Sequence, residues 1–212
     1  MKDMEKQGKF IVFEGTDGSG KSTQMKLLGK YLEGRGQKCS FTREPTDSKF
    51  GSLLHSCMTG EIDTDEHTIA ALFAADRLDH INNPKNGMKA SLAQGLTVLC
   101  DRYYFSSFAY NGGFVPLDWV VALNTPAMQE LKPDLVIYID VSPEESMKRV
   151  SRRGETERYE TLEKQLKIRE NYFNVFKRFP NENVVVIKSE EDKNATQEKI
   201  RAAVNGLYGW SK

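Results

Sequence analysis

The sequence predicts an α/β fold, a three-layer sandwich in which a five-stranded parallel sheet carries helices on both faces. Five short apolar runs recur along the chain, at residues 9–14, 38–44, 96–102, 135–141 and 183–189. Each run is continuous rather than alternating, which is typical of strands that are buried on both faces. Segments with helical periodicity separate the runs, and this alternation indicates parallel strands joined by helices.

Apolar residues at helical spacing locate helices between these runs. Met25, Leu28 and Leu32 fall on one face of a segment that Gly34 and Gly36 should end. Similar periodicity predicts further helices over residues 65–81, 118–131 and 162–179.

The length of 212 residues suits one domain with a full hydrophobic core. We therefore expect a single domain over residues 1–212, with the polar residues 1–8 as a loose tail. Thirty basic and thirty acidic residues give a formal net charge of zero, which argues against nucleic acid as the main partner. No apolar run approaches the roughly 18 residues of a membrane span, and the polar start is unlike a signal peptide.

The three cysteines, Cys39, Cys57 and Cys100, are odd in number and lack C-x-x-C spacing. Their neighbours are apolar or helical, so we expect reduced core cysteines rather than a disulfide or a zinc site. This usage favours a cytoplasmic location.

The segment FEGTDGSGKST, residues 13–23, follows the first apolar run. Gly15, Gly20, Lys21 and Ser22 fit the pattern G-x-x-x-x-G-K-[ST], in which backbone N–H groups and a helix N-terminus surround phosphate oxygens. The pattern predicts a P-loop NTP hydrolase-like fold; the alternative is a glycine-rich turn with a surface lysine. Lys21 would reach the β- and γ-phosphates of ATP and Ser22 would ligate Mg²⁺. The residues expected to contact ATP are Gly15, Thr16, Asp17, Gly18, Ser19, Gly20, Lys21, Ser22 and Thr23.

Charged residues follow the second and third runs, where ligands of parallel sheets collect. Asp101 occupies the place of a carboxylate that orients Mg²⁺, although it would also suit a helix N-cap. Arg102 beside it and Arg43 could each offer a bidentate fork to a second phosphate. An exposed ion pair between Arg43 and Glu44 is the alternative for that strand end.

The segment SRRGETERYE, at about residues 151–160, places Arg152, Arg153 and Arg158 between two helices. After the fourth strand of a P-loop fold, it suggests a lid that closes arginines over the transferred phosphoryl group. A solvated run of balanced charges is the alternative.

Six motifs now resemble one family in order and spacing. FEGTDGSGKST, REP, ALFAADR, DRYYFSSFAYNGG, PLDW with KPD, and ERYE resemble the corresponding segments of thymidylate kinases, over about residues 9–190. The resemblance implies transfer of the γ-phosphoryl group of ATP to dTMP, giving ADP and dTDP with Mg²⁺ required. It also implies a homodimer, formed through helices that include residues 65–82.

The resemblance assigns roles to individual residues. Asp17 resembles the carboxylate that meets the deoxyribose 3′-hydroxyl, and Arg43 and Arg102 resemble the pair that holds the dTMP phosphate. Phe73 resembles the aromatic residue that stacks on thymine, although its helical spacing also suits a core residue. The expected substrate-binding residues are Asp17, Arg43, Phe73, Arg77, Arg102, Ser106, Tyr110, Asn111 and Tyr159. The expected catalytic residues are Asp17, Lys21, Arg102, Arg152, Arg153 and Arg158, and the metal ligands are Ser22 and Asp101.

Three departures from the family pattern affect these roles. Gly18 stands where some members carry a basic residue, so the lid must supply any catalytic arginine. Asn111 replaces a glutamine common in the family, and a shorter amide either reaches the base edge or leaves room for water. The segment TDSKFG after REP stands in place of a glycine-rich form common in bacterial members, which leaves the contacts of Asp47 and Ser48 open.

Three other functions compete with a dTMP kinase. A deoxynucleoside kinase shares the Glu-Gly start of the loop but phosphorylates a hydroxyl and therefore needs a base. A monophosphate acceptor is already ionised and needs none, which suits a site rich in arginine. A kinase for another nucleoside monophosphate differs only in base recognition, whereas a nucleotide-binding switch leaves the acceptor motifs unexplained.

Overall fold

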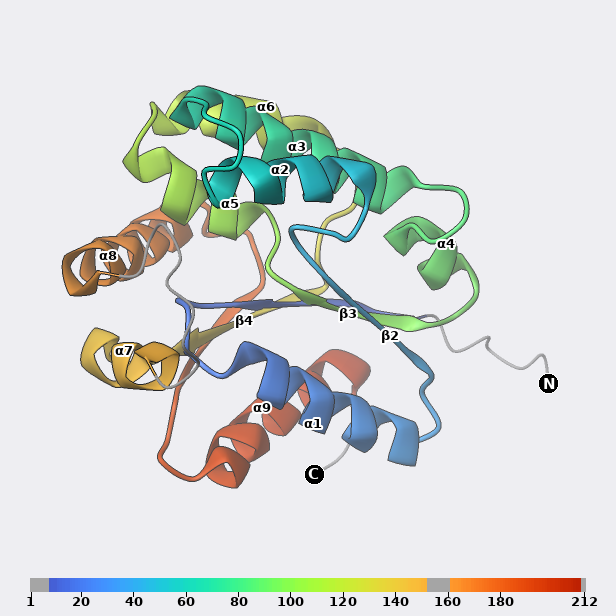
Figure 1. Ribbon diagram of the computed structural model, residues 1–212. Coiled ribbons are helices and arrows are strands. Elements are labelled where there is room, and N and C mark those ends of the chain that lie inside the picture. The colour runs from blue at the N-terminus through green and yellow to red at the C-terminus, as the bar shows by residue number, and fades with distance from the viewer. Residues whose placement is uncertain (1–7, 152–160, 211–212) are drawn as a thin grey trace.

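The centre of the molecule is a five-stranded parallel sheet with the strand order β2-β3-β1-β4-β5. This computed structural model describes residues 8–151 and 161–210, and helices cover both faces of its sheet (Figure 1). The strands are β1 Phe10–Glu14, β2 Cys39–Arg43, β3 Thr97–Asp101, β4 Leu135–Asp140 and β5 Val184–Lys188. Each strand falls inside one of the five apolar runs, so the predicted α/β sheet is confirmed.

Burial along the strands depends on their place in the sheet. The three central strands, β3, β1 and β4, are buried along almost their whole length, whereas the edge strands β2 and β5 are only partly covered. The continuous apolar runs of the central strands follow from helices on both faces.

One face of the sheet is covered by two helices, α1 Lys21–Gly34 and α9 Lys193–Tyr208 (Figure 1). Met25, Leu28 and Leu32 of α1 pack in the core on this face, as their spacing predicts. The helix ends at the predicted glycine, and Gly36 behind it has φ of +78°. Fully burying one such leucine stabilises a fold by about 1.5–3 kcal/mol.

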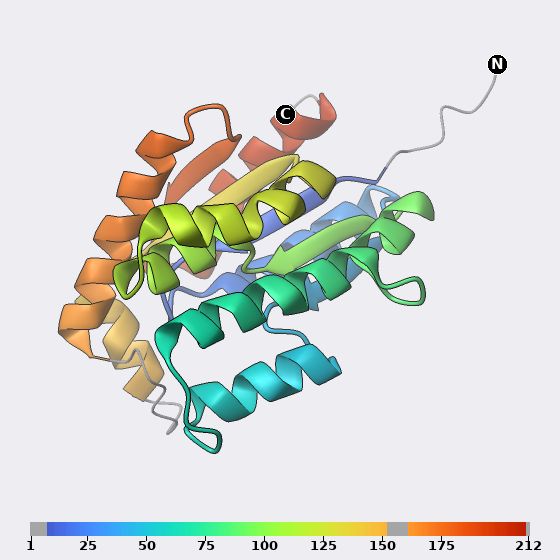
Figure 2. The same ribbon diagram turned by 90° about the horizontal axis from the view of Figure 1, so that it is seen from above.

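The opposite face carries a thicker layer. It contains α3 Glu66–Asn82, α4 Met88–Ala93, α5 Tyr104–Tyr110, the 3₁₀ turn η1 Asn111–Gly113, α6 Leu117–Glu130 and α8 Leu162–Arg178. The helices α3, α6 and α8 match the predicted segments to within a few residues. Helix α7 Pro143–Ser151 follows β4, and α2 Lys49–Met58 lies beside α3 (Figures 1 and 2).

Helix α5 is unusual because all of its residues are buried. It therefore has no polar face, and its sequence lacks amphipathic periodicity. Helices α2, α4, α5 and α9 are additions to the elements expected from the sequence. Of the described helices, none is both long and apolar enough to span a bilayer.

The register of the sheet determines which strand ends meet. Phe13 of β1 and Arg43 of β2 both pair with Asp101 of β3. The residues that follow these three positions therefore emerge side by side at the carboxyl edge of the sheet. Ligands of parallel sheets bind at this edge, so the sequence motifs at residues 14–23, 43–48 and 101–111 converge there.

Candidate active site

The phosphate-binding loop, residues 15–20, joins β1 to α1 through left-handed backbone conformations. The φ angles are +147° at Gly15, +76° at Gly18 and +95° at Gly20. A Cβ atom at Gly15 would lie 2.7 Å from the Ser19 hydroxyl oxygen and 2.8 Å from the Ile139 carbonyl oxygen. A larger residue would therefore be both strained and in collision. Gly20 is the N-cap of α1, so the loop ends at a helix N-terminus, which favours anions.

Lys21 lies folded over this loop. Its ammonium donates to the carbonyl oxygens of Gly15 and Thr16, at 3.1 Å each, and the residue is 7% exposed. Burial lowers the pKa of Lys21, and the positive charge of Arg102 lowers it further. The Lys21 ammonium therefore lies beside the loop, where the phosphate-binding pattern places the lysine that contacts the phosphates.

Ser22 and Asp101 meet across the end of the sheet. The Ser22 hydroxyl donates to Asp101 Oδ2 at 2.8 Å, whereas Asp101 Oδ1 is buried and accepts no hydrogen bond from the described residues. Asp101 is not a helix N-cap, because α5 begins at Tyr104 with Tyr103 as its N-cap. A hydroxyl beside a carboxylate oxygen with spare acceptor capacity suits Mg²⁺, which is usually held by one or two carboxylates together with phosphates.

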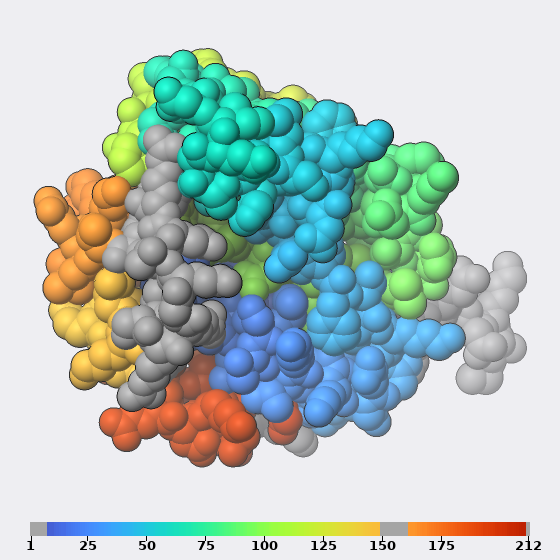
Figure 3. Space-filling model, in the orientation of Figure 1, coloured from blue at the N-terminus to red at the C-terminus, as the bar shows by residue number. Residues whose placement is uncertain are grey.

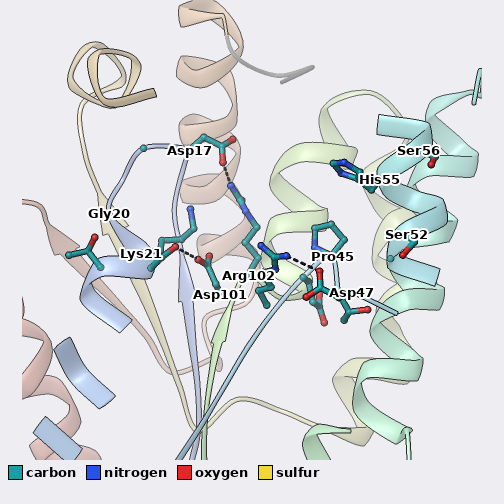
Figure 4. A pocket seen from close by; sticks show the side chains of 17 residues that line it. Asp17, Gly20, Lys21, Pro45, Asp47, Ser52, His55, Ser56, Asp101 and Arg102 are labelled. Atoms are coloured by element: carbon teal, nitrogen blue, oxygen red, sulfur yellow. Dashed lines mark hydrogen bonds and ion pairs between the residues drawn. The ribbon is translucent and has the colours of Figure 1, made fainter. Parts of the chain in front are cut away.

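Arg102 has the only positive φ among the described non-glycine residues, at +72°. Its guanidinium forms an ion pair with Asp17 (Figure 4) and donates to the Tyr110 hydroxyl at 3.1 Å and to the Ser106 hydroxyl at 3.2 Å. Burial alone would lower the pKa of Arg102, but Asp17 raises it well above its ordinary value. Burial would likewise raise the pKa of Asp17, but Arg102 and Lys21 hold it below its ordinary value.

Arg43 is the exposed cation of the site. Its guanidinium lies 2.8 Å from Asp47, and the two side chains are 67% and 86% exposed. The alternative of an exposed Arg43–Glu44 pair is wrong, because Glu44 turns inward. The Glu44 carboxylate is bound to Arg77, with nitrogen to oxygen distances of 2.8 and 2.6 Å, and to His80 at 3.1 Å.

One cavity of about 700 Å³ collects these groups. The loop and α1 line one side of it, the ends of β2 and β3 its floor, and α2 the other side (Figure 4). In the space-filling view, the blue surface of the loop faces the cyan surface of α2 on the same side of the molecule (Figure 3). The predicted residues that line the cavity are Asp17, Gly18, Gly20, Lys21, Ser22, Thr23, Arg43, Asp101 and Arg102.

Phe73 and Arg77 lie on α3, outside the lining of this cavity. Phe73 is half-buried against a small apolar cluster of Leu54, Cys57 and Ile69. Arg77 is 1% exposed, and besides Glu44 it donates to Ser107 at 3.0 Å and to Asn124. Their contacts with a base stay predictions.

Ser106, Tyr110 and Asn111 lie behind Arg102, on α5 and η1. Ser106 and Tyr110 hold its guanidinium, and the Tyr110 hydroxyl donates to Asp17 at 3.1 Å. Asn111 is 1% exposed, and its side-chain oxygen and nitrogen have no hydrogen-bond partner in the described structure. The arginines Arg152, Arg153 and Arg158 and the nearby Tyr159 lie outside the described residues.

Two carboxylates of the site are absent from the sequence-based predictions. Glu14 is fully buried directly before the loop. Burial raises its pKa, although the hydrogen bond from Ser106 and the charge of Arg102 act to lower it. Asp76, 1% exposed on α3, accepts hydrogen bonds from the Thr46 N–H and from the Thr46 and Ser48 hydroxyls. Such buried carboxylates could be found from the sequence only as charged residues inside an apolar run or on the inner face of a predicted helix.

A phosphate-binding loop with its lysine, a carboxylate beside its serine and two arginines in one cavity define a P-loop phosphotransferase. Comparison with known sequences gives the family. The family model described as thymidylate kinase matches residues 13–200. The chain belongs to the thymidylate kinase family, and the expectation of a nucleoside monophosphate kinase is confirmed.

Curated relatives agree with this family over nearly the whole chain. A probable thymidylate kinase of Thermococcus kodakarensis is 39% identical over 210 residues, which cover 94% of this chain and 98% of the relative. A probable thymidylate kinase of Pyrococcus horikoshii is 40% identical, covering 88% and 92%. The thymidylate kinase of Caldicellulosiruptor saccharolyticus is 35% identical, covering 95% and 98%.

Proposed function

We propose that this protein transfers the γ-phosphoryl group of ATP to dTMP, giving ADP and dTDP. One observation carries the proposal beyond family membership: Lys21 of the phosphate-binding loop and the arginines Arg43 and Arg102 line the same cavity. A lysine at the phosphate-binding loop and two arginines in the same cavity suit two phosphorylated ligands, one as donor and one as acceptor.

ATP would be held by the loop and by the N-terminus of α1. Lys21 would leave the carbonyl oxygens of Gly15 and Thr16 and turn its ammonium to the phosphates. Ser22 and Asp101 would hold Mg²⁺, which when bound supplies positive charge to the phosphate oxygens.

Arg102 and Arg43 would bind the acceptor phosphate. A phosphate monoester already carries ionised oxygens near neutral pH, so attack on the γ-phosphorus needs no strong base. The chain then contributes chiefly by positioning the two nucleotides and by stabilising charge. Whether Arg152, Arg153 or Arg158 adds to that charge stays a prediction.

The surroundings of Glu14 exclude this carboxylate as the base that a deoxynucleoside kinase would need. A hydroxyl acceptor needs a base, and Glu14 is the carboxylate immediately before the loop. It is fully buried and already accepts hydrogen bonds from Tyr103, Ser106 and Tyr172. A carboxylate enclosed in this way does not reach an acceptor.

Asn111 is the strongest candidate for reading the base. Its buried amide offers one donor group and one acceptor atom that the described residues leave unpaired. Thymine presents an N–H beside carbonyl oxygens, which is the complementary pattern. Phe73 and Arg77 are proposed to stack on the base and to donate to it, as the family resemblance implies.

A coupled assay of ADP release tests this function. Purified protein is given ATP and Mg²⁺ with dTMP, dUMP, dCMP, dGMP or thymidine in turn. We expect dTMP to be the preferred acceptor and thymidine to be inert. A Lys21→Met variant is the control, because its turnover should fall by at least about 100-fold. Faster turnover of thymidine than of dTMP would contradict the proposal.

The protein is further proposed to act in the cytoplasm as a homodimer, with α3 at the contact between subunits. Sedimentation velocity of the purified chain measures the assembly state directly. A monomer at the concentration of the assay would contradict the dimer.

A further inference from the structure

Arg102 needs support at two places, its backbone and its side chain. Its φ of +72° is a backbone conformation that costs a non-glycine residue free energy and persists only where neighbouring contacts enforce it. Its guanidinium also stands in an open cavity, where a long side chain would otherwise sample several rotamers. Both constraints have to come from groups around it.

Glu14 supplies the backbone constraint. It is the last residue of β1 and is fully buried. Its Oε1 accepts the N–H of Tyr103 at 2.9 Å and the N–H of Ser106 at 3.2 Å. These are the N-cap and an early residue of α5, a helix whose own N-cap side chain makes no capping hydrogen bond. Glu14 therefore caps α5 from another strand and anchors the chain directly after Arg102.

Glu14 also contributes to the side-chain constraint, through Ser106, beside the ion pair of the guanidinium with Asp17 and its hydrogen bond to Tyr110. The Ser106 hydroxyl lies 2.6 Å from Glu14 Oε2 and donates to it, and it accepts from Arg102 Nη1 at 3.2 Å. With its proton directed to Glu14, the serine oxygen is left as an acceptor for the arginine. The Tyr172 hydroxyl of α8 donates to the same Oε2 at 2.8 Å.

We infer that Glu14 is a positioning residue for the acceptor: it holds the backbone and the guanidinium of Arg102 so that this arginine meets the acceptor phosphate. Glu14 itself touches no substrate, because it is enclosed and does not line the cavity. The inference rests on the proposed function, in which Arg102 binds the dTMP phosphate. A buried carboxylate is costly unless donors compensate it, and here each donor belongs to an element that frames Arg102.

Glu14→Gln tests the inference, because it keeps the shape but presents an NH₂ group or a weaker acceptor to these donors. We expect the KM for dTMP to rise about 10- to 150-fold, the range for a lost charge-assisted hydrogen bond. The KM for ATP should stay within about twofold of the unchanged protein, because Lys21 donates to the Gly15 and Thr16 carbonyls and not to Glu14, and Glu14 is the smallest of the charge effects on the pKa of Lys21.

Two tyrosines give a matched pair in case Glu14→Gln does not fold. Tyr172→Phe removes one donor to Glu14 and should raise the KM for dTMP about 3- to 10-fold. Tyr104→Phe removes an equally buried hydroxyl, which donates to Glu182 at 3.0 Å and has no link to Arg102. Its KM for dTMP should be unchanged.

A double-mutant cycle with Arg102→Ala separates positioning from general stability. If Glu14 acts through Arg102, adding Glu14→Gln, or Tyr172→Phe in its place, to Arg102→Ala should change kcat/KM for dTMP by less than about twofold. Additive losses would overturn the inference and leave Glu14 as a purely structural residue. An unchanged KM for dTMP in Arg102→Ala alone would instead contradict the proposed function.

Discussion

Replacing Asn111 by leucine should stabilise the protein and weaken its binding of dTMP. The amide is 1% exposed, and its oxygen and nitrogen have no partner among the described residues. A buried polar group without a partner, such as this amide, costs about 1–3 kcal/mol. Leucine fills a similar volume without polar atoms, so we expect the free energy of unfolding to rise by about 1–3 kcal/mol. For a chain of this size, each kcal/mol raises the Tm by about 2–4 °C.

The same substitution should remove the two hydrogen bonds to the base that we propose for Asn111. At about 0.5–1.5 kcal/mol each, their loss raises the KM for dTMP about 5- to 150-fold. Thermal unfolding by circular dichroism gives the first quantity, and the coupled ADP assay gives the second. A lower Tm together with an unchanged KM would refute the reasoning, because it would mean that the amide is satisfied by the protein itself.

Asn124 provides the matched control for Asn111. It is equally buried, but its oxygen accepts from Arg77 and its nitrogen donates to the Val120 carbonyl at 2.8 Å. Asn124→Leu leaves the Arg77 guanidinium short of an acceptor, so it should destabilise the protein by about 1.5–3 kcal/mol. The two substitutions are chemically identical and should move the Tm in opposite directions.

Three further predictions concern the supports of the site. Asp76→Ala removes three hydrogen bonds from the segment after Arg43, so it should lower the free energy of unfolding by about 2 kcal/mol or more and raise the KM for dTMP. Urea unfolding and kinetics that both match the unchanged protein would contradict this prediction. Leu28→Ala, at a fully buried position, should cost about 2–5 kcal/mol and leave kcat unaltered; a loss below 1 kcal/mol by urea titration would argue against tight packing of α1. The lowered pKa of Asp17 should contribute stability above its ordinary pKa of 3.8 that is lost as pH falls. Asp17→Asn should flatten that acid-side decline in Tm, and an identical pH profile would count against it.

The sheet follows from the sequence because burial on both faces leaves a simple trace. The central strands are covered by helices, so the middle of each of their runs is apolar with polar residues only towards its ends, and each strand lies inside its run. The sequence predicts the edge strands in the same way, because residues such as Phe41 and Val186 are apolar although they are about half exposed. The phosphate loop can also be predicted, from its glycine and lysine spacing, because a left-handed backbone conformation admits few residue types.

Helix α5 and the buried polar contacts around it could not be predicted in the same way. A helix buried on every side has no amphipathic period. The partners of Glu14, Asp76 and Arg77 come from segments distant in sequence, and only the packed fold brings them together. The outward turn of Arg43 and the inward turn of Glu44 likewise depend on the charges that α3 presents, which no local pattern specifies.

Simultaneous binding of donor and acceptor is the central claim, and calorimetry measures it directly. dTMP is titrated into the protein alone and into the protein saturated with ADP and Mg²⁺. The proposed binding of the donor by Lys21 and of the acceptor by Arg43 and Arg102 predicts one dTMP bound per chain in both titrations, with Arg102→Ala weakening dTMP but not ADP. Loss of dTMP binding once ADP is present would mean that the two nucleotides share a single anion site, and would contradict the account.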